Sequence, residues 1–412
     1  MKPAPRSSAS SASRLAVAVA VACALAASAC STEQDEAVRI GGLFSTTGPE
    51  AAKGFAQLSA ARVAVQQIND NGGVLGKRLV LVYRDDGGDA NKTRRAVEAL
   101  LDESVPAIIG AVSSASTEIA ASIAAKKAVI VSASATASSF ESVDLSTFRL
   151  CASAAAEGRL LAARALRTGH RAAVLRSAEK GLDDVASEFE TRFRRDGGEV
   201  LSSQPLVAGA ESYRTVLAEA LAGDPDVVLL DLDPLDGAQV VRDYSLGLSN
   251  RHARWFFTHR LVDAAFVTAA GPHAFAFPHE GTAPSTPTGM RFKYFADAYQ
   301  ERFGEPPPAG SYAANAYDAV FLVAASMEAA KDATAAGVRA QLRATSLGGA
   351  ALGPNEWADL AKAAQSGQDI NYEGASGSVD INVTGSVDAP FDIWQVESGS
   401  ITVIERAVRP PL

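Results

Sequence analysis

The stretch VRIGGLFSTTGP, residues 38–49, decides the fold, because an apolar run of strand length breaks there into small polar residues before helical spacing begins. The same order recurs where LVLVY (79–83) runs into DDGG and where AIIGAV (107–112) runs into SSAST. Alternation of strands with helices predicts a parallel α/β sheet. Ligands of such sheets bind beyond the carboxyl ends of the strands, where this chain gathers its hydroxyl side chains.

The amino terminus has the pattern of an export signal. Lys2, Arg6 and Arg14 precede an apolar run over residues 15–29, which is short for a membrane span and typical of a signal-peptide core. Small residues end the run before Cys30, in a pattern that resembles a bacterial lipobox with Cys30 as the acylated residue. An ordinary signal peptide with an incidental cysteine is the alternative, and an uncleaved anchor is a third.

Composition narrows the class of protein. Removing residues 1–29 leaves 383 of the 412 residues and changes the net charge from −9 to −12, because the segment holds three basic and no acidic residues. An acidic exported chain is a poor candidate for nucleic-acid binding, and the length predicts two lobes. Cys151 would be the only cysteine left to the folded part, so no disulfide is expected within it.

The second half of the chain repeats the alternation. Strands are expected at 172–175, 226–232 and 255–257, and helices at 182–194, 213–221, 289–303 and 311–331. The last two helices are expected to be amphipathic. Apolar residues alternate with polar ones over 379–383 and 391–396, which predicts antiparallel edge strands.

Six motifs at these boundaries resemble the Leu/Ile/Val-binding family of periplasmic solute-binding proteins. They are STTGPEAAKG (45–54), INDNGGVLGK (68–77), DD (85–86), IIGAVSSAST (108–117), SASAT (132–136) and YEGASGSVD (372–380). The resemblance implies an α/β fold with two Rossmann-like lobes, parallel sheets flanked by helices, three crossover strands at the hinge and a ligand cleft between the lobes. It also implies a monomer without catalysis, cofactor or metal, which passes a small solute to the permease of an ABC importer.

The resemblance also implies where the lobes divide. Lobe 1 would comprise residues 37–152 and 284–374, and lobe 2 would comprise 153–283 and 375–408. Residues 1–29 would be the lipoprotein signal peptide and 30–36 a tether. The protein is therefore expected in the periplasm or at the cell surface, held to the membrane only through the lipid on Cys30.

The family's carboxylate subsite maps onto three residues. Ser114 and Thr136 match hydroxyl residues that hold the α-carboxylate of the ligand, and Ser134 matches a position that makes contact through its backbone. The start of a helix near Ser114 favours an anion, because its N–H groups are unpaired and its dipole is positive there. The alternative is that Ser114 only caps the helix and Thr136 only satisfies a loop.

The family's ammonium subsite does not map. Amino-acid-binding members carry an acidic residue after the strand that is 255–257 here, where this chain has His259 and Arg260. A second acidic position falls among the alanines 154–156. An unpaired ammonium in a dry cleft costs several kcal/mol, on the order of 2–7 for a polar group and more for a charge, so a branched-chain amino acid is an unexpected ligand.

Three further positions depart from the family. An aromatic residue that closes over the ligand aligns near Gly181, a tyrosine position reads Asp233, and Lys53 replaces the tyrosine after the Gly-Pro turn. Asp233 remains a possible counter-charge for a cation. Tyr312 and Tyr317 lie either near the hinge or in helix packing.

These departures suggest a solute with a carboxylate and a second acidic or polar end. Lys53, His259 or Arg260 would hold the second end, since guanidinium binds carboxylate through paired hydrogen bonds. Alternatively, Lys53 and Arg260 lie on the rim, solvated or paired with Asp233 or Asp263. The same altered positions leave open a ligand-sensing or scaffold lipoprotein of this fold without transport, whereas a hydrolase would need a nucleophile and base that the chain lacks.

Overall fold

The first lobe is built on a parallel sheet of five strands in the order β2-β1-β3-β4-β5. This is a computed structural model that describes residues 37–140, 146–179, 184–247, 252–271 and 273–411. The strands are β1 (Val38–Phe44), β2 (Leu79–Asp85), β3 (Ala107–Gly110), β4 (Val129–Ser132) and β5 (Thr147–Arg149). The helices are α2 (Ala51–Asp70), α3 (Ala90–Asp102), α4 (Ser114–Ala124), α10 (Met290–Phe303), α11 (Ala313–Ala330), α12 (Ala335–Gln341) and α13 (Trp357–Gln365).

The second lobe holds a sheet of seven strands in the order β15-β14-β10-β9-β8-β6-β7. Its parallel strands are β6 (Arg171–Ser177), β7 (Glu199–Leu206), β8 (Val227–Asp231), β9 (Arg254–Phe257) and β10 (His279–Pro284). The antiparallel strands are β14 (Phe391–Glu397) and β15 (Ser400–Val408). The helices are α5 (Ala154–Ala165), α6 (Asp184–Arg195), α7 (Arg214–Ala220), α8 (Pro234–Gly247) and α9 (Ala264–Ala270).

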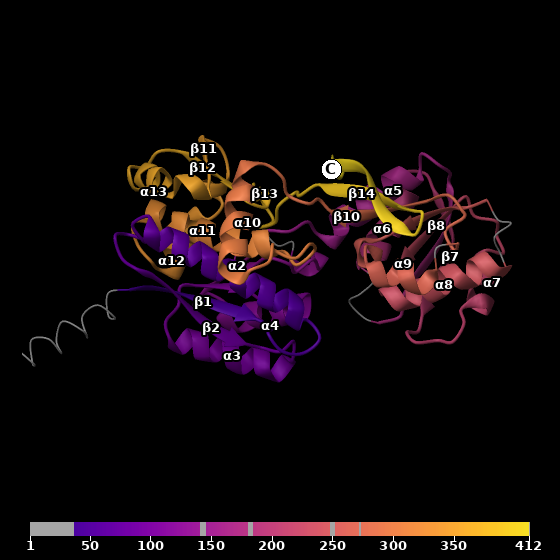
Figure 1. Cartoon of the computed structure of the whole chain (residues 1–412), viewed down its shortest axis with the longest axis horizontal. Helices are drawn as coiled ribbons and strands as arrows, with labels where there is room; N and C mark the ends of the chain where they lie inside the picture. Colours follow the sequence, from indigo (N-terminus) through magenta and orange to yellow (C-terminus); the bar gives the residue numbers. More distant parts are fainter. Residues whose placement is uncertain (1–36, 141–145, 180–183, 248–251, 272, 412) are drawn as a thin grey trace, which may run out of the picture.

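Figure 1 shows the two sheets in separate lobes, with β10 and β14 on the side of the second sheet that faces the first lobe. Three connections link the lobes: β5 to α5, β10 to α10, and β13 (Gly377–Ser378) to β14. With two parallel-rich sheets flanked by helices, the structure confirms the predicted α/β fold.

Helix α11 is the centre of the first lobe. Of its 18 residues 15 are buried, so the helix is buried on all sides rather than on one face as its sequence suggested. The helix packs against α2, α12 and α13, and Tyr317 lies fully buried in this packing. Tyr317 therefore belongs to the helix packing and not to the hinge.

A buried carboxylate in α11 explains the YEGASG motif. Asp318 accepts hydrogen bonds from Tyr372 Oη (2.8 Å), Ala375 N (2.8 Å), Ser376 N (2.7 Å) and Ser376 Oγ (2.5 Å). These groups form the turn between β12 (Ile370–Gly374) and β13, which pair in a small sheet with β11 (Ala350–Leu352). A Cβ at Gly374 would lie 2.2 Å from Asp318 Oδ2, so only glycine fits there.

Two expected elements differ in the structure. Residues 379–383 form no strand, and the segment makes only an isolated bridge between Ile381 and Val387. The apolar alternation arises because Val379 and Ile381 reach into the first-lobe core, whereas Val383 is 64% exposed. Residues 277–288, where the sequence predicted no strand, contain β10, which pairs with β9 and β14.

Candidate functional site

The carboxyl ends of β3 and β4 form the first-lobe side of the candidate site. Helix α4 begins there, and Ser113 is its N-cap, with Ser113 Oγ accepting a hydrogen bond from Ser116 N at 3.1 Å. Ser114 Oγ instead accepts from Ala137 N at 3.1 Å. Ser114 is therefore not the cap, and its hydroxyl ties α4 to the loop that carries Thr136.

Ser134 is buried and its hydroxyl is engaged within the lobe. Ser134 Oγ donates to Val112 O at 2.7 Å and accepts from Gln57 Nε2 at 2.9 Å. The same Gln57 nitrogen donates to Ser311 O at 3.0 Å. The loop after β4 is thus held by α2 and by the turn before α11.

Thr136 lines a small cavity between the lobes. Its carbonyl accepts a hydrogen bond from Ala154 N at 2.8 Å, at the start of α5. The cavity is lined by Thr136, Ala152, Ser153, Ala154, Glu157, His259, Pro284, Tyr312 and Phe391. Its volume of about 10 Å³ is about that of one water, so a solute of amino-acid size does not fit inside it with the lobes as they stand.

The second-lobe wall of the cavity is a buried carboxylate–histidine pair. Glu157, 1% exposed, accepts from His259 N at 2.7 Å and from Thr282 Oγ1 at 2.5 Å, and its other oxygen lies 2.5 Å from His259 Nδ1. Burial lowers the pKa of His259, but the Glu157 carboxylate outweighs burial and raises the pKa above its ordinary value. Both oxygens of Glu157 are therefore occupied.

A second ionic cluster lies at the ends of β8 and β9. Arg260 donates to Asp233 Oδ1 at 2.7 Å and lies 3.7 Å from Asp231 Oδ1, which also accepts from Thr258 Oγ1 at 2.9 Å. Burial raises the pKa of Asp231 to about 6, against the lowering effect of Arg260. The pairing of Arg260 with Asp233 is the rim arrangement that the sequence left open, and the pairing with Asp263 is not seen.

The remaining expected site residues are less central. Lys53, in the first turn of α2, pairs with Glu50 at 2.8 Å, and both side chains are about one third exposed. Gly181 and Cys30 lie outside the described residues. The cavity lining therefore includes Thr136 and His259. The other expected site residues are not part of the lining: Ser114, Ser134, Lys53, Asp233 and Arg260.

Two residues that line the cavity, and Cys151 next to its lining residue Ala152, were missed or left unassigned. Glu157 follows the three alanines 154–156. Its position in the first turn of α5 is the feature of the sequence that could have identified it as a site residue. Tyr312 lines the cavity with φ of 58°, a left-handed conformation unusual for a bulky residue. Cys151, in the first connection, is 2% exposed, and burial raises the pKa of its thiol to about 11.

Other features of the described chain bear less on the site. An apolar hollow of about 540 Å³ lies at the start of α10, lined by Met290 and Phe292 but without a cluster of polar groups. Within the residues that the structure describes, no group of His, Cys, Asp and Glu side chains is arranged to hold a metal ion. None of the described helices combines the length and the apolar character needed to cross a bilayer.

Comparisons with known proteins agree with this geometry. Residues 37–371 match a family described as periplasmic binding protein. The chemotactic signal transduction system substrate-binding protein BasB of Halobacterium salinarum is 25% identical over 90% of this chain and 89% of its own. The Leu/Ile/Val-binding protein homolog 3 of Brucella melitensis is 23% identical over 89% of this chain and 94% of its own.

Two solved structures share the fold. The branched-chain amino acid transporter substrate-binding protein LivJ of Streptococcus pneumoniae, in complex with isoleucine, has a TM-score of 0.69 at 20% identity, over 91% of this chain and 100% of its own. A solute-binding protein of an ABC transporter from R. palustris, in complex with benzoate, has a TM-score of 0.66 at 18% identity, over 90% and 97% of the two chains.

Proposed function

Because this chain belongs to the periplasmic binding protein family, whose members are binding proteins and not enzymes, we propose that it captures a small carboxylate-bearing solute between its lobes for an ABC importer. Contacts from both lobes would favour the closed form, and the importer would respond to closure. The lobe boundaries at 152/153 and 283/284, and the monomeric state, are part of this proposal. The third boundary, expected at 374/375, moves to the connection between β13 and β14, because Val379 and Ile381 pack in the first-lobe core.

The observation that carries the proposal is the contrast across the small cavity. The first-lobe residues of the cavity include the hydroxyl residue Thr136 and no charged side chain. Ser114, at the start of α4, is bonded to Ala137 N, next to Thr136 in the chain. Helix α4 has 11 residues, and the unpaired N–H groups of its first turn favour an anion. We therefore assign the solute's carboxylate to this side, with Ser134 holding the loop in place.

The second-lobe side disfavours a free ammonium group. Glu157 already accepts from the backbone and ring of His259 and from Thr282, so an incoming ammonium would have to displace one of these donors. We propose an acid without an ammonium group, whose second end meets His259, Arg260 or Lys53. The benzoate complex of a protein of this fold supports that class, and the isoleucine complex of another supports the competing one.

Thermal shift with single acids tests the proposal. Benzoate, 3,4-dihydroxybenzoate, succinate, 2-ketoisocaproate, leucine and isoleucine would be added separately to protein refolded to remove carried-over solute. A ligand at a hundred times its Kd adds about 2.7 kcal/mol of stability, which moves the midpoint by several degrees. A shift with the acids that lack an amine supports the proposal, and a shift with leucine or isoleucine alone contradicts the proposed solute class.

Variants then locate the second end of the solute. Arg260→Ala should weaken binding of the acid found in the screen if the guanidinium contacts it, because a charge-assisted pair is lost. Arg167→Ala, which removes an exposed arginine of the same lobe, is the matched control. Unchanged affinity in Arg260→Ala would place Arg260 on the rim, paired only within the lobe.

A sensing role is the second candidate, and one observation favours it. The relative from Halobacterium salinarum is named a chemotactic signal transduction system substrate-binding protein. In that case the closed form would be read by a receptor rather than by a permease. Deleting a permease gene encoded nearby should abolish uptake of the identified acid if the protein serves import, and should leave the response to that acid intact if it serves sensing.

We also propose that the chain is exported and lipid-anchored through Cys30. The basic residues, the apolar run and the small residues before Cys30 support this. Globomycin should leave a larger, unprocessed precursor, whereas unchanged processing would contradict the lipoprotein assignment.

A further inference from the structure

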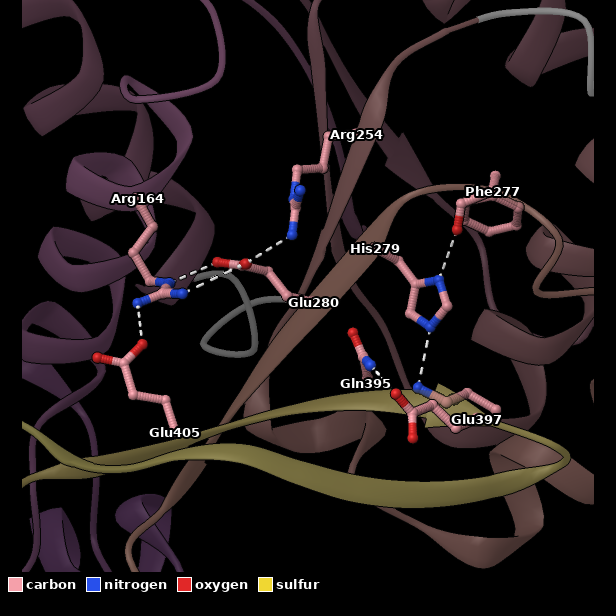
Figure 2. Close-up of polar contacts among 9 residues, drawn as sticks. Arg164, Arg254, Phe277, His279, Glu280, Gln395, Glu397 and Glu405 are labelled. Carbon is pink, nitrogen blue, oxygen red and sulfur yellow. Dashed lines mark hydrogen bonds and ion pairs between the residues drawn. The ribbon is translucent and has the colours of Figure 1, made fainter.

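His279, the first residue of β10, is a buried histidine that the proposed function does not use. It is 8% exposed and lies among three phenylalanine rings, with centroid distances of 5.6 Å to Phe257, 5.5 Å to Phe275 and 5.5 Å to Phe277. Figure 2 shows the imidazole between the Phe277 carbonyl and the backbone of β14. Charging a ring in such surroundings is unfavourable.

The two hydrogen bonds of His279 fix its protonation state. Nδ1 lies 2.7 Å from Phe277 O, and a carbonyl only accepts, so Nδ1 must carry the hydrogen. Nε2 lies 2.9 Å from Val396 N, and an amide nitrogen only donates, so Nε2 must be the acceptor. The ring is therefore neutral, with its single hydrogen on Nδ1.

A proton on Nε2 would face the Val396 N–H and break that bond. Of the charged groups on the neighbouring elements, Glu280 (β10) already pairs with Arg164 (α5) and with Arg254 (β9), and Glu405 (β15) pairs with Arg164. Glu397 (β14) accepts from Gln395. Burial, and to a lesser degree the charge of Arg254, lower the pKa of His279. The carboxylates drawn in Figure 2 thus each have another partner.

The broken bond would lie where two of the three connections enter the second lobe. The antiparallel pairing of β10 and β14 runs from Pro284–Phe391 to Gly281–Trp394. Beyond its end, the His279 side chain adds one more hydrogen bond between the strands, from Val396 N to Nε2. Strand β10 leads to α10 of the first lobe, and β14 receives the connection from β13.

We infer that His279 is an acid-sensitive clasp between β10 and β14, which opens when Nε2 takes a proton and which loosens the anchorage of two connections. The inference is independent of the identity of the solute. The folded protein resists protonation of His279, whereas the unfolded chain accepts the proton from pH 6.5 downward. The free energy of unfolding therefore decreases as the pH falls below 6.5.

Wild-type protein labelled with ¹³C-histidine gives the first test. The chain has five histidines, so each ring resonance can be followed through a titration from pH 8 to 5. One resonance should keep the shifts of a neutral ring with its hydrogen on Nδ1 at pH 6, after an ordinary histidine is half or more protonated. The inference is overturned if all five resonances titrate above pH 6.

Hydrogen exchange in wild type and His279→Gln gives the second test. A glutamine carries both a donor and an acceptor and does not titrate, and the exposed His273→Gln is the matched control. After correction for intrinsic exchange, amides of residues 391–397 should exchange at least about threefold faster at pH 5 than at pH 7 in wild type and control, but not in His279→Gln. Equal pH dependence in all three proteins would overturn the inference, and the titration of wild type decides the matter if His279→Gln does not fold.

Discussion

The two lobes present different chemistry to the space between them. On the first-lobe side, Ser114, Ser134 and Thr136 are neutral hydroxyl residues whose loops are held together by hydrogen bonds. On the second-lobe side, Glu157, His259, Asp231 and Arg260 form buried or half-buried ion pairs. An anion at the first edge would break no ion pair, whereas the second edge must break a pair to offer either charge.

Removing Glu157 should have the largest effect, because it destroys the buried pair of the second-lobe side. Glu157→Ala leaves a buried histidine and threonine without their acceptor, and breaking a buried pair costs about 3–5 kcal/mol. Urea unfolding measures the loss. The double replacement Glu157→Leu with His259→Leu should lose less than Glu157→Ala, because it leaves no charge behind, and the exposed Glu219→Ala should lose under about 0.5 kcal/mol. Equal stability of Glu157→Ala and wild type would show that the pair is not structural.

Asp231 makes the second lobe less stable as the pH rises from about 4 to about 6. Its folded-state pKa of about 6 lies above the ordinary value of 3.8, so the folded protein binds this proton more tightly than the unfolded chain. Stability from Asp231 is present below pH 4 and is lost as the pH rises through 6, up to about 3 kcal/mol. Asp231→Asn should therefore gain stability relative to wild type as the pH rises from about 4 to about 6, while the exposed Asp297→Asn should not. Parallel pH curves for wild type and Asp231→Asn would contradict this.

Thr136 tests the first-lobe edge with a smaller effect. Thr136→Val keeps the volume and removes the hydroxyl, so the unfolding midpoint of the free protein should stay within about 2 °C, corresponding to roughly 0.5 kcal/mol. Affinity for the acid found in the screen should fall about tenfold, or about 1.4 kcal/mol, because a hydrogen bond to a carboxylate is lost. Calorimetry measures the change, and Ser139→Ala on the same loop is the control. Full affinity in Thr136→Val would remove its hydroxyl from the site.

Lys53 should give the smallest change. Its pair with Glu50 is partly exposed, so Lys53→Ala should alter the free energy of unfolding by less than about 0.5 kcal/mol. A loss of affinity without loss of stability would assign Lys53 to the second end of the solute. Unchanged affinity would leave it on the rim with Arg260.

The fold was more predictable from the sequence than the site. Strand β1 begins and ends where its apolar run does, and the glycines at 197 and 198 follow the end of α6. These features are local, because chain sterics and apolar spacing determine them. Helix α11 escaped correct description because its burial on all sides depends on packing against α2, α12 and α13, which the spacing of apolar residues within one helix does not reveal.

The site depended on partners that sequence spacing does not reveal. Consecutive serines at 113 and 114 suit a helix cap equally well, and only the coordinates assign the cap to Ser113. Glu157 lies 102 residues from His259, so the alanines before it looked like the loss of an acidic position. The hydroxyl residues near Ser134 lie in contiguous motifs, and their contact with a solute stays a prediction.

Cys151 allows the opening of the first connection to be measured without introducing a cysteine by mutation. Its thiol is buried in the first connection, 3.4 Å from Ala135 O, and is the free cysteine of the described chain. With its pKa near 11, the thiol is slow to form the reactive thiolate at neutral pH. The rate at which a maleimide dye attaches to Cys151 would therefore report how often the first connection opens to solvent. A slower rate in the presence of a bound acid would show that closure of the lobes protects this thiol.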